Sequence, residues 1–262
     1  MGVFPRIYIA LMLFPSFLFA DLLETVLHTQ QLRVCIWPEY YGISYLNPRT
    51  QKLSGIDVDL AQEFASTLGV NVSFVQSSFA TLIQDLLSHR CDIAMFAIGI
   101  TPERQKYLRF TSPHLQSDIY AIVSKSNNRI QTWDDIDQDG VVVTVAKGTY
   151  HVKLMQDALR KASLHVVDSL RAREQEVESG RADVMMSDYP FSTQLLVEKE
   201  WAKRIAPTSS FHPTSYAWAL DKNEEALYSR AEAFMQTIKR DGRLQTIAKR
   251  YALDPIVVVT PP

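Results

Sequence analysis

The chain has 262 residues, of which 47% are hydrophobic and 21% charged, and its formal net charge is −2. These values are typical of a globular protein with one large or two ordinary domains, and they exclude a disordered chain and a strongly basic nucleic-acid-binding surface. The glycines form no phosphate-binding loop and the cysteines and histidines no zinc motif, so we expect neither a cofactor nor a metal.

The first 20 residues differ in kind from the rest of the chain. Arg6 is the only charged residue before Asp21, and the run from Ile7 to Ala20 is almost wholly apolar. This run is shorter than the ~20 residues that a membrane span needs, and a lone positive charge before it is typical of a secretory signal peptide. We therefore predict a signal peptide over residues 1–20, although Leu18 stands where a small residue is usual. An uncleaved membrane anchor is the alternative.

Export from the cytoplasm permits disulfides. Cys35 and Cys91 are the only cysteines, and both lie in or just before predicted buried strands, where Cys often serves as a small hydrophobic residue. We favour two buried thiols. A bridge is the alternative if the two strands are neighbours in the right register.

Apolar runs and amphipathic stretches alternate in the first half of the chain. The predicted strands cover residues 32–37, 70–75 and 93–98, and the predicted helices cover residues 57–68, closed by Gly69, and 79–88. Residues 46–54 form a hairpin-like turn between the first strand and the first helix. This alternation predicts a parallel sheet with helices on both faces.

The same alternation recurs in the second half. The predicted strands cover residues 119–124, 141–145, 164–167 and 183–186, and the predicted helices 151–162, 170–179 and 190–199. A capped helical turn at 132–136, an extended segment at 216–220 and two helices within 224–251, separated at Asp241-Gly242, complete the chain. The recurrence predicts two α/β lobes with a cleft between their strand ends.

The first alternation ends in a strand that runs into a helix N-terminus. Pro102 suits the first helical position and Thr101 the N-cap, which places Arg104 in the first turn. Open α/β sheets bind ligands outside the carboxyl ends of their strands, and Arg can hold a carboxylate with two parallel hydrogen bonds. We interpret Arg104 as a ligand-carboxylate site. The alternative is an exposed Arg on a surface helix.

Four ordered groups of residues resemble the periplasmic solute-binding proteins of amino-acid ABC transporters, the family 3 extracellular solute-binding proteins. These are Gly55–Ala61, Ile100–Arg104 with Phe110–Pro113, Lys147–Thr149 with Ala182–Asp188, and Asp241–Leu244. The resemblance covers about residues 32–253. It implies two Rossmann-like α/β lobes joined by a two-strand hinge, the type II periplasmic binding protein fold. Lobe 1 would comprise residues 21–118 and 216–262, and lobe 2 residues 119–215, with hinge segments near 119–124 and 211–220.

The resemblance also implies a function and a set of ligand contacts. A small amino acid or related carboxylate would be captured between the lobes of a periplasmic monomer and delivered to a membrane permease, without catalysis. Arg104 would bind the α-carboxylate with Thr149, and Asp188 the α-ammonium, whereas Tyr40 and Phe79 would stack on the ligand side chain. The alternative for Asp188 is an N-cap of the following helix.

The sequence departs from the family pattern beside Arg104. Phe96, Ala97 and Gly99 stand where polar ligand contacts are usual, and the first strand ends in Trp37 rather than in an acidic residue. The other candidate contacts are the Gly99 backbone N–H, Thr101 and Tyr150. We expect a ligand side chain that is apolar, aromatic, or a cation held by aromatic faces. The alternative is that Trp37 and Phe96 are lobe core.

Two other classes of function remain open. Periplasmic cyclohexadienyl and arogenate dehydratases resemble this family, and their loss of water and carbon dioxide needs a general acid. In those enzymes a Glu follows shortly after the site Asp, whereas Tyr189 and Pro190 follow Asp188 here. Glu39 and Glu103 remain candidate acids. The third class is a ligand-sensing module detached from its effector, because no membrane span or catalytic domain follows the two lobes.

Overall fold

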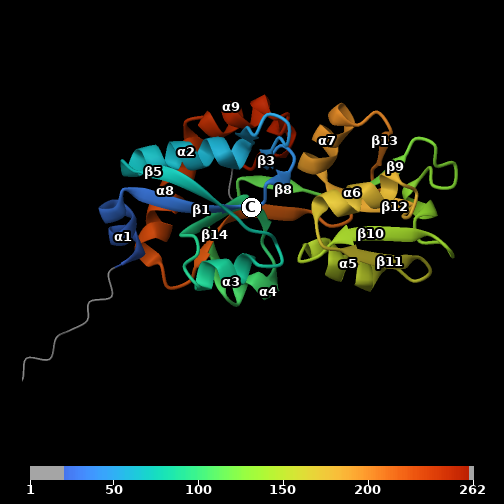
Figure 1. Cartoon of the computed structure of the whole chain (residues 1–262), viewed down its shortest axis with the longest axis horizontal. Helices are drawn as coiled ribbons and strands as arrows, with labels where there is room; N and C mark the ends of the chain where they lie inside the picture. The colour runs from blue at the N-terminus through green and yellow to red at the C-terminus, as the bar shows by residue number, and fades with distance from the viewer. Residues whose placement is uncertain (1–20, 260–262) are drawn as a thin grey trace, which may run out of the picture.

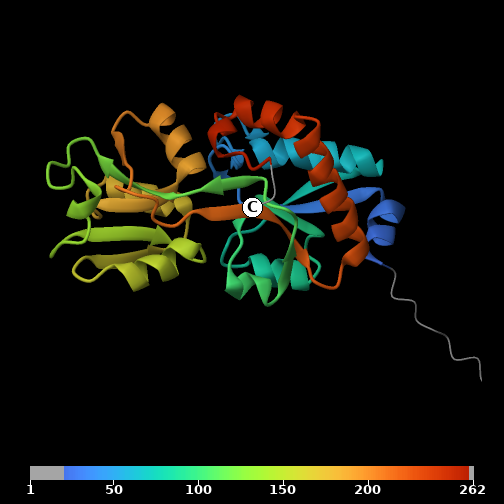
Figure 2. The same cartoon turned by 180° about the vertical axis from the view of Figure 1, so that it is seen from behind.

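The computed structural model describes residues 21–259, so the predicted signal peptide over residues 1–20 lies outside the described residues. Figure 1 shows two α/β lobes lying side by side along the long axis of the molecule. The chain passes from the first lobe into the second and returns, as the reverse view in Figure 2 also shows. The two-lobed α/β fold predicted from the sequence is thereby confirmed.

The first lobe is built on a sheet with the strand order β5-β1-β6-β14-β7, in which β8 also pairs with β14. The strands are β1 (Gln31–Ile36), β5 (Asn71–Gln76), β6 (Ile93–Gly99), β7 (Leu108–Phe110), β8 (Leu115–Ser117) and β14 (Thr214–Asp221). β1 is parallel to β5 and β6, whereas β14 is antiparallel to β6. The parallel strands therefore end at one edge, and the strand that returns from the second lobe runs against them.

Helices cover both faces of this sheet. They are α1 (Leu22–Thr29), α2 (Ile56–Leu68), α3 (Leu82–Leu87), α4 (Pro102–Gln105), α8 (Glu225–Arg240) and α9 (Arg243–Arg250). Figures 1 and 2 show α2 and α9 above the sheet and α3 and α4 below it. A small sheet of β2 (Glu39–Tyr40), β3 (Ser44–Leu46) and β4 (Leu53–Ser54) follows β1. Gly69 closes α2 in the left-handed conformation, as predicted.

The second lobe has a sheet with the order β11-β10-β12-β9-β13. Its elements are β9 (Ile119–Ser124), the 3-10 turn Trp133–Asp135, β10 (Val142–Ala146), α5 (Tyr150–Ala158), β11 (Ser163–Val167), α6 (Leu170–Glu178), β12 (Val184–Asp188), α7 (Tyr189–Glu198) and β13 (Ala202–Ile205). β10 is parallel to β11 and β12, whereas β9 is antiparallel to β12 and β13. A final 3-10 turn, Asp254–Ile256, packs beside β8 of the first lobe.

The long predicted elements are present, and the short ones differ. The elements predicted from the sequence do not include α1, β7, β8 or β13, and the helix that begins at Pro102 is only a single turn. These short strands have no long apolar run of their own, and pairing with β14 or β9 stabilises them. The exact lobe boundaries and hinge segments remain predictions, and β14 already begins at Thr214.

A disulfide joins Cys35 in β1 to Cys91 just before β6, with the two Cα atoms 5.6 Å apart. Our preferred interpretation of two buried thiols is therefore wrong. β1 and β6 are parallel neighbours, with Cys35 opposite Ala94, and this pairing brings the two cysteines within bridging distance.

Asp118 holds together the two segments that connect the sheets. Its carboxylate accepts hydrogen bonds from the backbone N–H groups of Ile119 (2.8 Å), Phe211 (2.9 Å) and His212 (2.8 Å), and from the Ser210 hydroxyl (3.0 Å). Burial alone would raise the pKa of Asp118, but these hydrogen bonds outweigh it and lower the pKa below its ordinary value. The ionised carboxylate is thus the form that fixes both segments.

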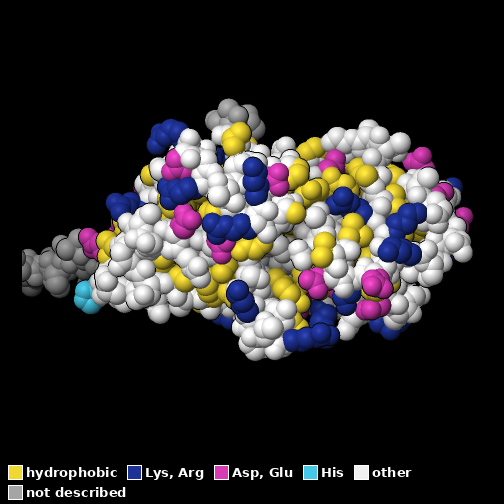
Figure 3. All heavy atoms as spheres, turned by 90° about the horizontal axis from the view of Figure 1, so that it is seen from above, with side chains coloured by type: hydrophobic (Ala, Val, Ile, Leu, Met, Phe, Trp, Pro, Cys, Tyr) yellow, Lys and Arg dark blue, Asp and Glu magenta, His cyan; other side chains and the backbone are white. Residues whose placement is uncertain are grey.

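The surface agrees with the near-neutral composition. Figure 3 shows Lys and Arg side chains interspersed with Asp and Glu over the face that carries α2, α7 and α9. Between residues 21 and 259, no helix is both long and apolar enough to cross a membrane.

Candidate functional site

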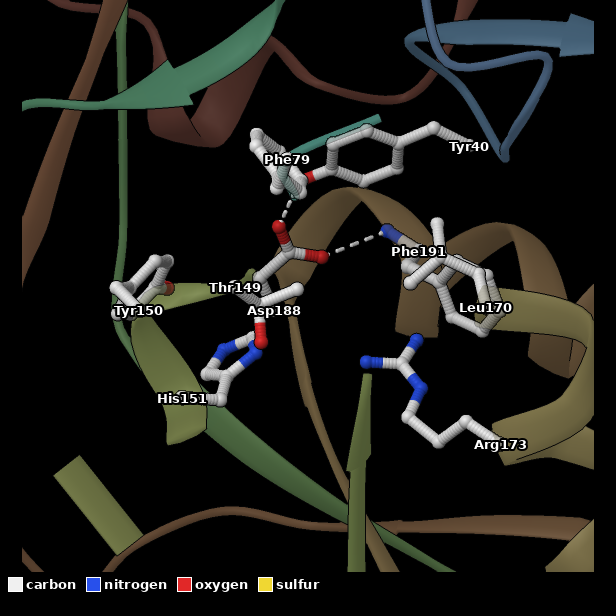
Figure 4. A pocket seen from close by; sticks show the side chains of 9 residues that line it. All are labelled: Tyr40, Phe79, Thr149, Tyr150, His151, Leu170, Arg173, Asp188 and Phe191. Atoms are coloured by element: carbon white, nitrogen blue, oxygen red, sulfur yellow. Dashed lines mark hydrogen bonds between the residues drawn. The ribbon is translucent and has the colours of Figure 1, made fainter. Parts of the chain in front are cut away.

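A small cavity of about 20 Å³ lies where the two lobes meet. Its lining comes from both lobes: Tyr40, Phe79, Thr149, Tyr150, His151, Leu170, Arg173, Asp188 and Phe191. Figure 4 shows Tyr40 and Phe79 of the first lobe facing Asp188 of the second. The cavity lies beyond the carboxyl ends of parallel strands in both lobes, where open α/β sheets bind ligands.

Asp188 ends β12 and also caps α7. Its position therefore agrees with the predicted ligand contact and with the alternative of a helix N-cap. Its carboxylate accepts hydrogen bonds from the Phe191 backbone N–H (3.1 Å), from the Tyr216 hydroxyl (3.0 Å) and from the Tyr40 hydroxyl. Burial raises the pKa of Asp188 above its ordinary value, although these hydrogen bonds oppose the shift. The donors fix a buried carboxylate that faces the cavity.

Arg104 is buried in the first turn of α4, where Thr101 caps the helix by accepting the Arg104 backbone N–H at 3.3 Å. Only 6% of Arg104 is exposed, so the alternative of an exposed surface Arg is wrong. Its Nη1 donates to the Gly99 carbonyl (2.8 Å) and its Nη2 to the Gly148 carbonyl of the other lobe (3.0 Å). Burial lowers the pKa of Arg104 to about 10, which leaves the guanidinium charged at neutral pH.

Phe79 is the centre of an aromatic cluster under Arg104. The Arg104 guanidinium carbon lies 4.9 Å from the centroid of the Phe79 ring, a cation–π geometry. The rings of Trp37 and Phe96 pack behind Phe79, with centroids 5.2 and 5.0 Å from it. Trp37 and Phe96 do not belong to the cavity lining. Both are buried core residues that position Phe79, as the alternative interpretation held.

Ala97 and Gly99 shape β6 rather than line the cavity. The Ala97 backbone N–H donates to the buried Asp57 carboxylate at 2.7 Å, and Ala97 has a positive φ of 49°. Gly99 pairs with Tyr216 in the sheet, and its carbonyl accepts from Arg104. Gly99 therefore helps to position Arg104, whereas Ala97 ties β6 to Asp57.

The turn after β10 brings the second lobe against the first. The Thr149 hydroxyl donates to the Ala146 carbonyl at 2.6 Å, and the Tyr150 hydroxyl lies 3.0 Å from the Tyr216 hydroxyl. Gly148 has a φ of 78°, and a Cβ there would lie 2.3 Å from the Ala80 backbone nitrogen. No other residue type fits this contact between lobes without a displacement.

Two polar residues of the cavity were not identified from the sequence. Arg173 is 1% exposed, donates from Nη1 to the Met186 carbonyl (2.7 Å) and lies with its guanidinium carbon 4.5 Å from the centroid of the Phe191 ring. His151 is 4% exposed and follows Tyr150. Burial lowers the pKa of Arg173 to about 10 and that of His151 well below its ordinary value. The i, i+3, i+7 spacing of Leu170, Arg173 and Val177 could have placed Arg173 on the apolar face of α6.

The carboxylic acids considered for catalysis lie elsewhere. Glu39 accepts the Arg171 backbone N–H at 3.1 Å, and Glu103 is exposed on α4. Within the described part of the chain, Asp188 is the carboxylic acid that lines the cavity.

A model of the bacterial extracellular solute-binding proteins, family 3, matches residues 32–254. The chain belongs to this family. The match spans both lobes, and it confirms the resemblance recognised from the motifs around Gly55, Arg104, Asp188 and Gly242.

Proteins that are similar to this chain include binding proteins and an enzyme. Cyclohexadienyl dehydratase of Pseudomonas aeruginosa is 33% identical over 221 residues, which cover 82% of this chain and 78% of that protein. The L-cystine-binding protein TcyJ of Escherichia coli is 28% identical over 253 residues, covering 96% and 93%. The crystal structure of the ancestral amino acid-binding protein AncCDT-1, a precursor of cyclohexadienyl dehydratase, has a TM-score of 0.81 and 27% identity and covers 88% of this chain and 99% of that one.

Proposed function

We propose that this protein captures a small amino acid or a related carboxylate between its lobes and delivers it to the permease of an ABC transporter. The observation that carries the proposal is that Asp188 of the second lobe lines the cavity, while Arg104 of the first lobe lies against the lining residue Phe79 and bridges to Gly148 of the second lobe. A guanidinium suits a carboxylate, and a buried carboxylate suits an ammonium group. Together these two residues form a clamp for a zwitterion.

The neighbouring residues support the same assignment. Tyr40, Phe79 and Tyr150 provide aromatic surface, and Thr149 lies in the lining at the start of α5, where helix N-termini favour anions. Ligand binding would draw the lobes together, with residues near 119–124 and 211–220 absorbing the change. We further infer export to the periplasm through residues 1–20, in keeping with a family of extracellular proteins.

Calorimetric titration of the purified protein with the common L-amino acids tests the binding function. We expect at least one of them to bind with micromolar or tighter affinity, the range that an uptake system needs. The proposal would be contradicted if none of these amino acids changed the thermal unfolding midpoint or produced a heat of binding.

A dehydratase is the second candidate, favoured by the 33% identity to cyclohexadienyl dehydratase. Such chemistry needs a general acid beside the leaving hydroxyl. Asp188 is the carboxyl group at the cavity, and burial raises its pKa in the direction that a general acid needs. Its three hydrogen-bond donors nevertheless orient it as an acceptor, which suits an ammonium group, and we favour binding without catalysis. Incubation with prephenate and arogenate decides between the two, since formation of phenylpyruvate or phenylalanine would establish the enzyme.

A further inference from the structure

Two buried side chains on one side of the cavity carry nitrogen atoms without hydrogen-bond partners. Nε and Nη2 of Arg173 and both ring nitrogens of His151 bond to no residue between 21 and 259. Figure 4 shows the His151 ring and the Arg173 guanidinium on the side of Asp188 that faces away from Tyr40 and Phe79. Buried polar groups are nearly always hydrogen-bonded, so these four nitrogens indicate a subsite for an acceptor group of a ligand.

The buried charges around the cavity are not balanced. Arg173 and Asp188 line the cavity and contribute one guanidinium and one carboxylate, and Arg104 contributes a second buried guanidinium directly behind the lining residue Phe79. Neither guanidinium takes part in an ion pair with any carboxylate of the described chain. Arg173 contacts a carbonyl oxygen and an aromatic face, and the Asp188 carboxylate acts on its charge without a direct ion pair, so this one carboxylate faces two buried cations. Because a buried charge without a counter-ion is costly, a ligand with one net negative charge would complete the site.

His151 fits the same acceptor. Burial and the nearby Arg173 lower the pKa of His151, so the ring is neutral and offers one N–H donor. Arg173 offers two further donors from its planar guanidinium, a geometry that matches a carboxylate. A carboxylate between these side chains would satisfy donors from both.

We propose that the ligand is an amino acid with an acidic side chain, whose second carboxylate binds to Arg173 and His151. This inference rests on the proposed function, in which Arg104 and Asp188 bind the α-carboxylate and α-ammonium groups. Two carboxylates and one ammonium give a net charge of minus one, which balances the site. A neutral amino acid leaves one cation unpaired, and a basic one adds a further positive charge. The inference differs from the apolar, aromatic or cationic side chain expected from the sequence.

Titration of the wild-type protein with L-aspartate, L-asparagine, L-glutamate and L-glutamine tests the inference, because each acid and its amide have nearly the same shape. We expect at least one acid to bind 10-fold or more tightly than its amide, the effect of about one charge-assisted hydrogen bond. Amides that bind as tightly as their acids would overturn the acidic ligand while leaving the binding function standing. Absence of binding by every L-amino acid would overturn both.

The variant Arg173→Met tests the subsite, with Arg171→Met on the exposed face of the same helix as a control. We expect Arg173→Met to weaken binding of the preferred acid about 10- to 100-fold and binding of its amide less than about 3-fold. Arg171→Met should change neither. An equal loss of affinity for the acid and for its amide in Arg173→Met would show that Arg173 only supports β12. It would overturn the assignment of Arg173 to the second carboxylate. If Arg173→Met does not fold, the comparison of each acid with its amide in the wild-type protein still tests whether the ligand is acidic.

Discussion

Asp188 lines the cavity between the lobes and Arg104 lies against its lining residue Phe79, and each is placed by the helix that follows its strand. The local pattern of a strand running into a capped helix indicated Arg104, whereas the resemblance to the family implied the role of Asp188 at the end of a strand. The bonds that hold them, from Arg104 to Gly148 and from Tyr40 to Asp188, join residues far apart in the chain. The two side chains are therefore brought close to each other only in the folded molecule.

Replacement of Arg104 by Met should abolish amino-acid binding and leave the fold intact. The loss of two charge-assisted hydrogen bonds to a carboxylate amounts to about 3 kcal/mol or more, which is over 100-fold in affinity. Titration calorimetry measures the affinity and circular dichroism the fold. Lys106→Met, at an exposed position just after the same turn, is the matched control and should bind normally. Retained affinity in Arg104→Met would refute the carboxylate site.

Asp188 should make binding depend on pH. Because burial raises its pKa, protonation begins at a higher pH than for an ordinary Asp, and affinity for an ammonium group falls as pH decreases through that range. The same shift means that the ionised form lowers folding stability as pH rises through the folded-state pKa. Asp188→Asn should therefore bind about 10- to 100-fold more weakly at pH 7 and unfold no more easily than the wild type. Calorimetric titrations between pH 4.5 and 8 measure this dependence. An affinity that does not fall with decreasing pH would show that Asp188 does not contact the ligand.

At the scale of elements, the segments that connect the sheets depend on Asp118. Its pKa is lowered, so its hydrogen bonds stabilise the fold above the ordinary Asp pKa, and that stability is lost as pH falls through the lowered value. Asp137 is a matched control, since it accepts the backbone N–H groups of Arg160 (2.9 Å), Lys161 (2.8 Å) and Ala162 (2.9 Å) within the second lobe.

Asp118→Ala and Asp137→Ala should each lower the free energy of unfolding by about 1–3 kcal/mol, as the loss of several hydrogen bonds to a carboxylate implies. Only Asp118→Ala should also change amino-acid affinity, because it frees the segments between the lobes. Urea unfolding and calorimetry on both variants provide the measurement. Equal affinities in the two variants would show that Asp118 has no part in closure.

At the scale of the molecule, the structure is a closed arrangement of the lobes. Contacts between the lobes include the hydrogen bonds from Tyr40 to Asp188 and from Arg104 to Gly148, and the close approach of Gly148 to Phe79 and Ala80. A type II binding protein must open to admit a ligand, so we expect the free protein to be more expanded than the bound one.

Gly148→Ala should block closure, because its Cβ would lie 2.3 Å from the Ala80 backbone nitrogen. Gly180→Ala is the matched control, with a similar φ of 75° but no atom within 4 Å of the added Cβ. Both variants carry backbone strain of about 1–2 kcal/mol. Only Gly148→Ala should lose affinity, by about 100-fold or more, since binding would then have to occur in the open form. X-ray scattering with and without a bound amino acid should show compaction in Gly180→Ala and none in Gly148→Ala.

The sequence by itself determined the alternation of strands and helices, the position of Arg104 in a helix N-terminus and the family motifs. These follow from local periodicity, capping and residue spacing, which act over a few residues. The short strands β7, β8 and β13 escaped prediction because their stability comes from pairing partners distant in the chain.

Only the tertiary structure decided which buried groups meet. The Cys35–Cys91 bridge depends on two strands lying side by side in register, and Trp37 and Phe96 pack behind Phe79 instead of lining the cavity. Arg173 appeared in the sequence as one charge of a polar helix, whereas the fold buries it beside Asp188. Charge balance within a cavity is a property of the assembled site, because it depends on distances that no local pattern specifies.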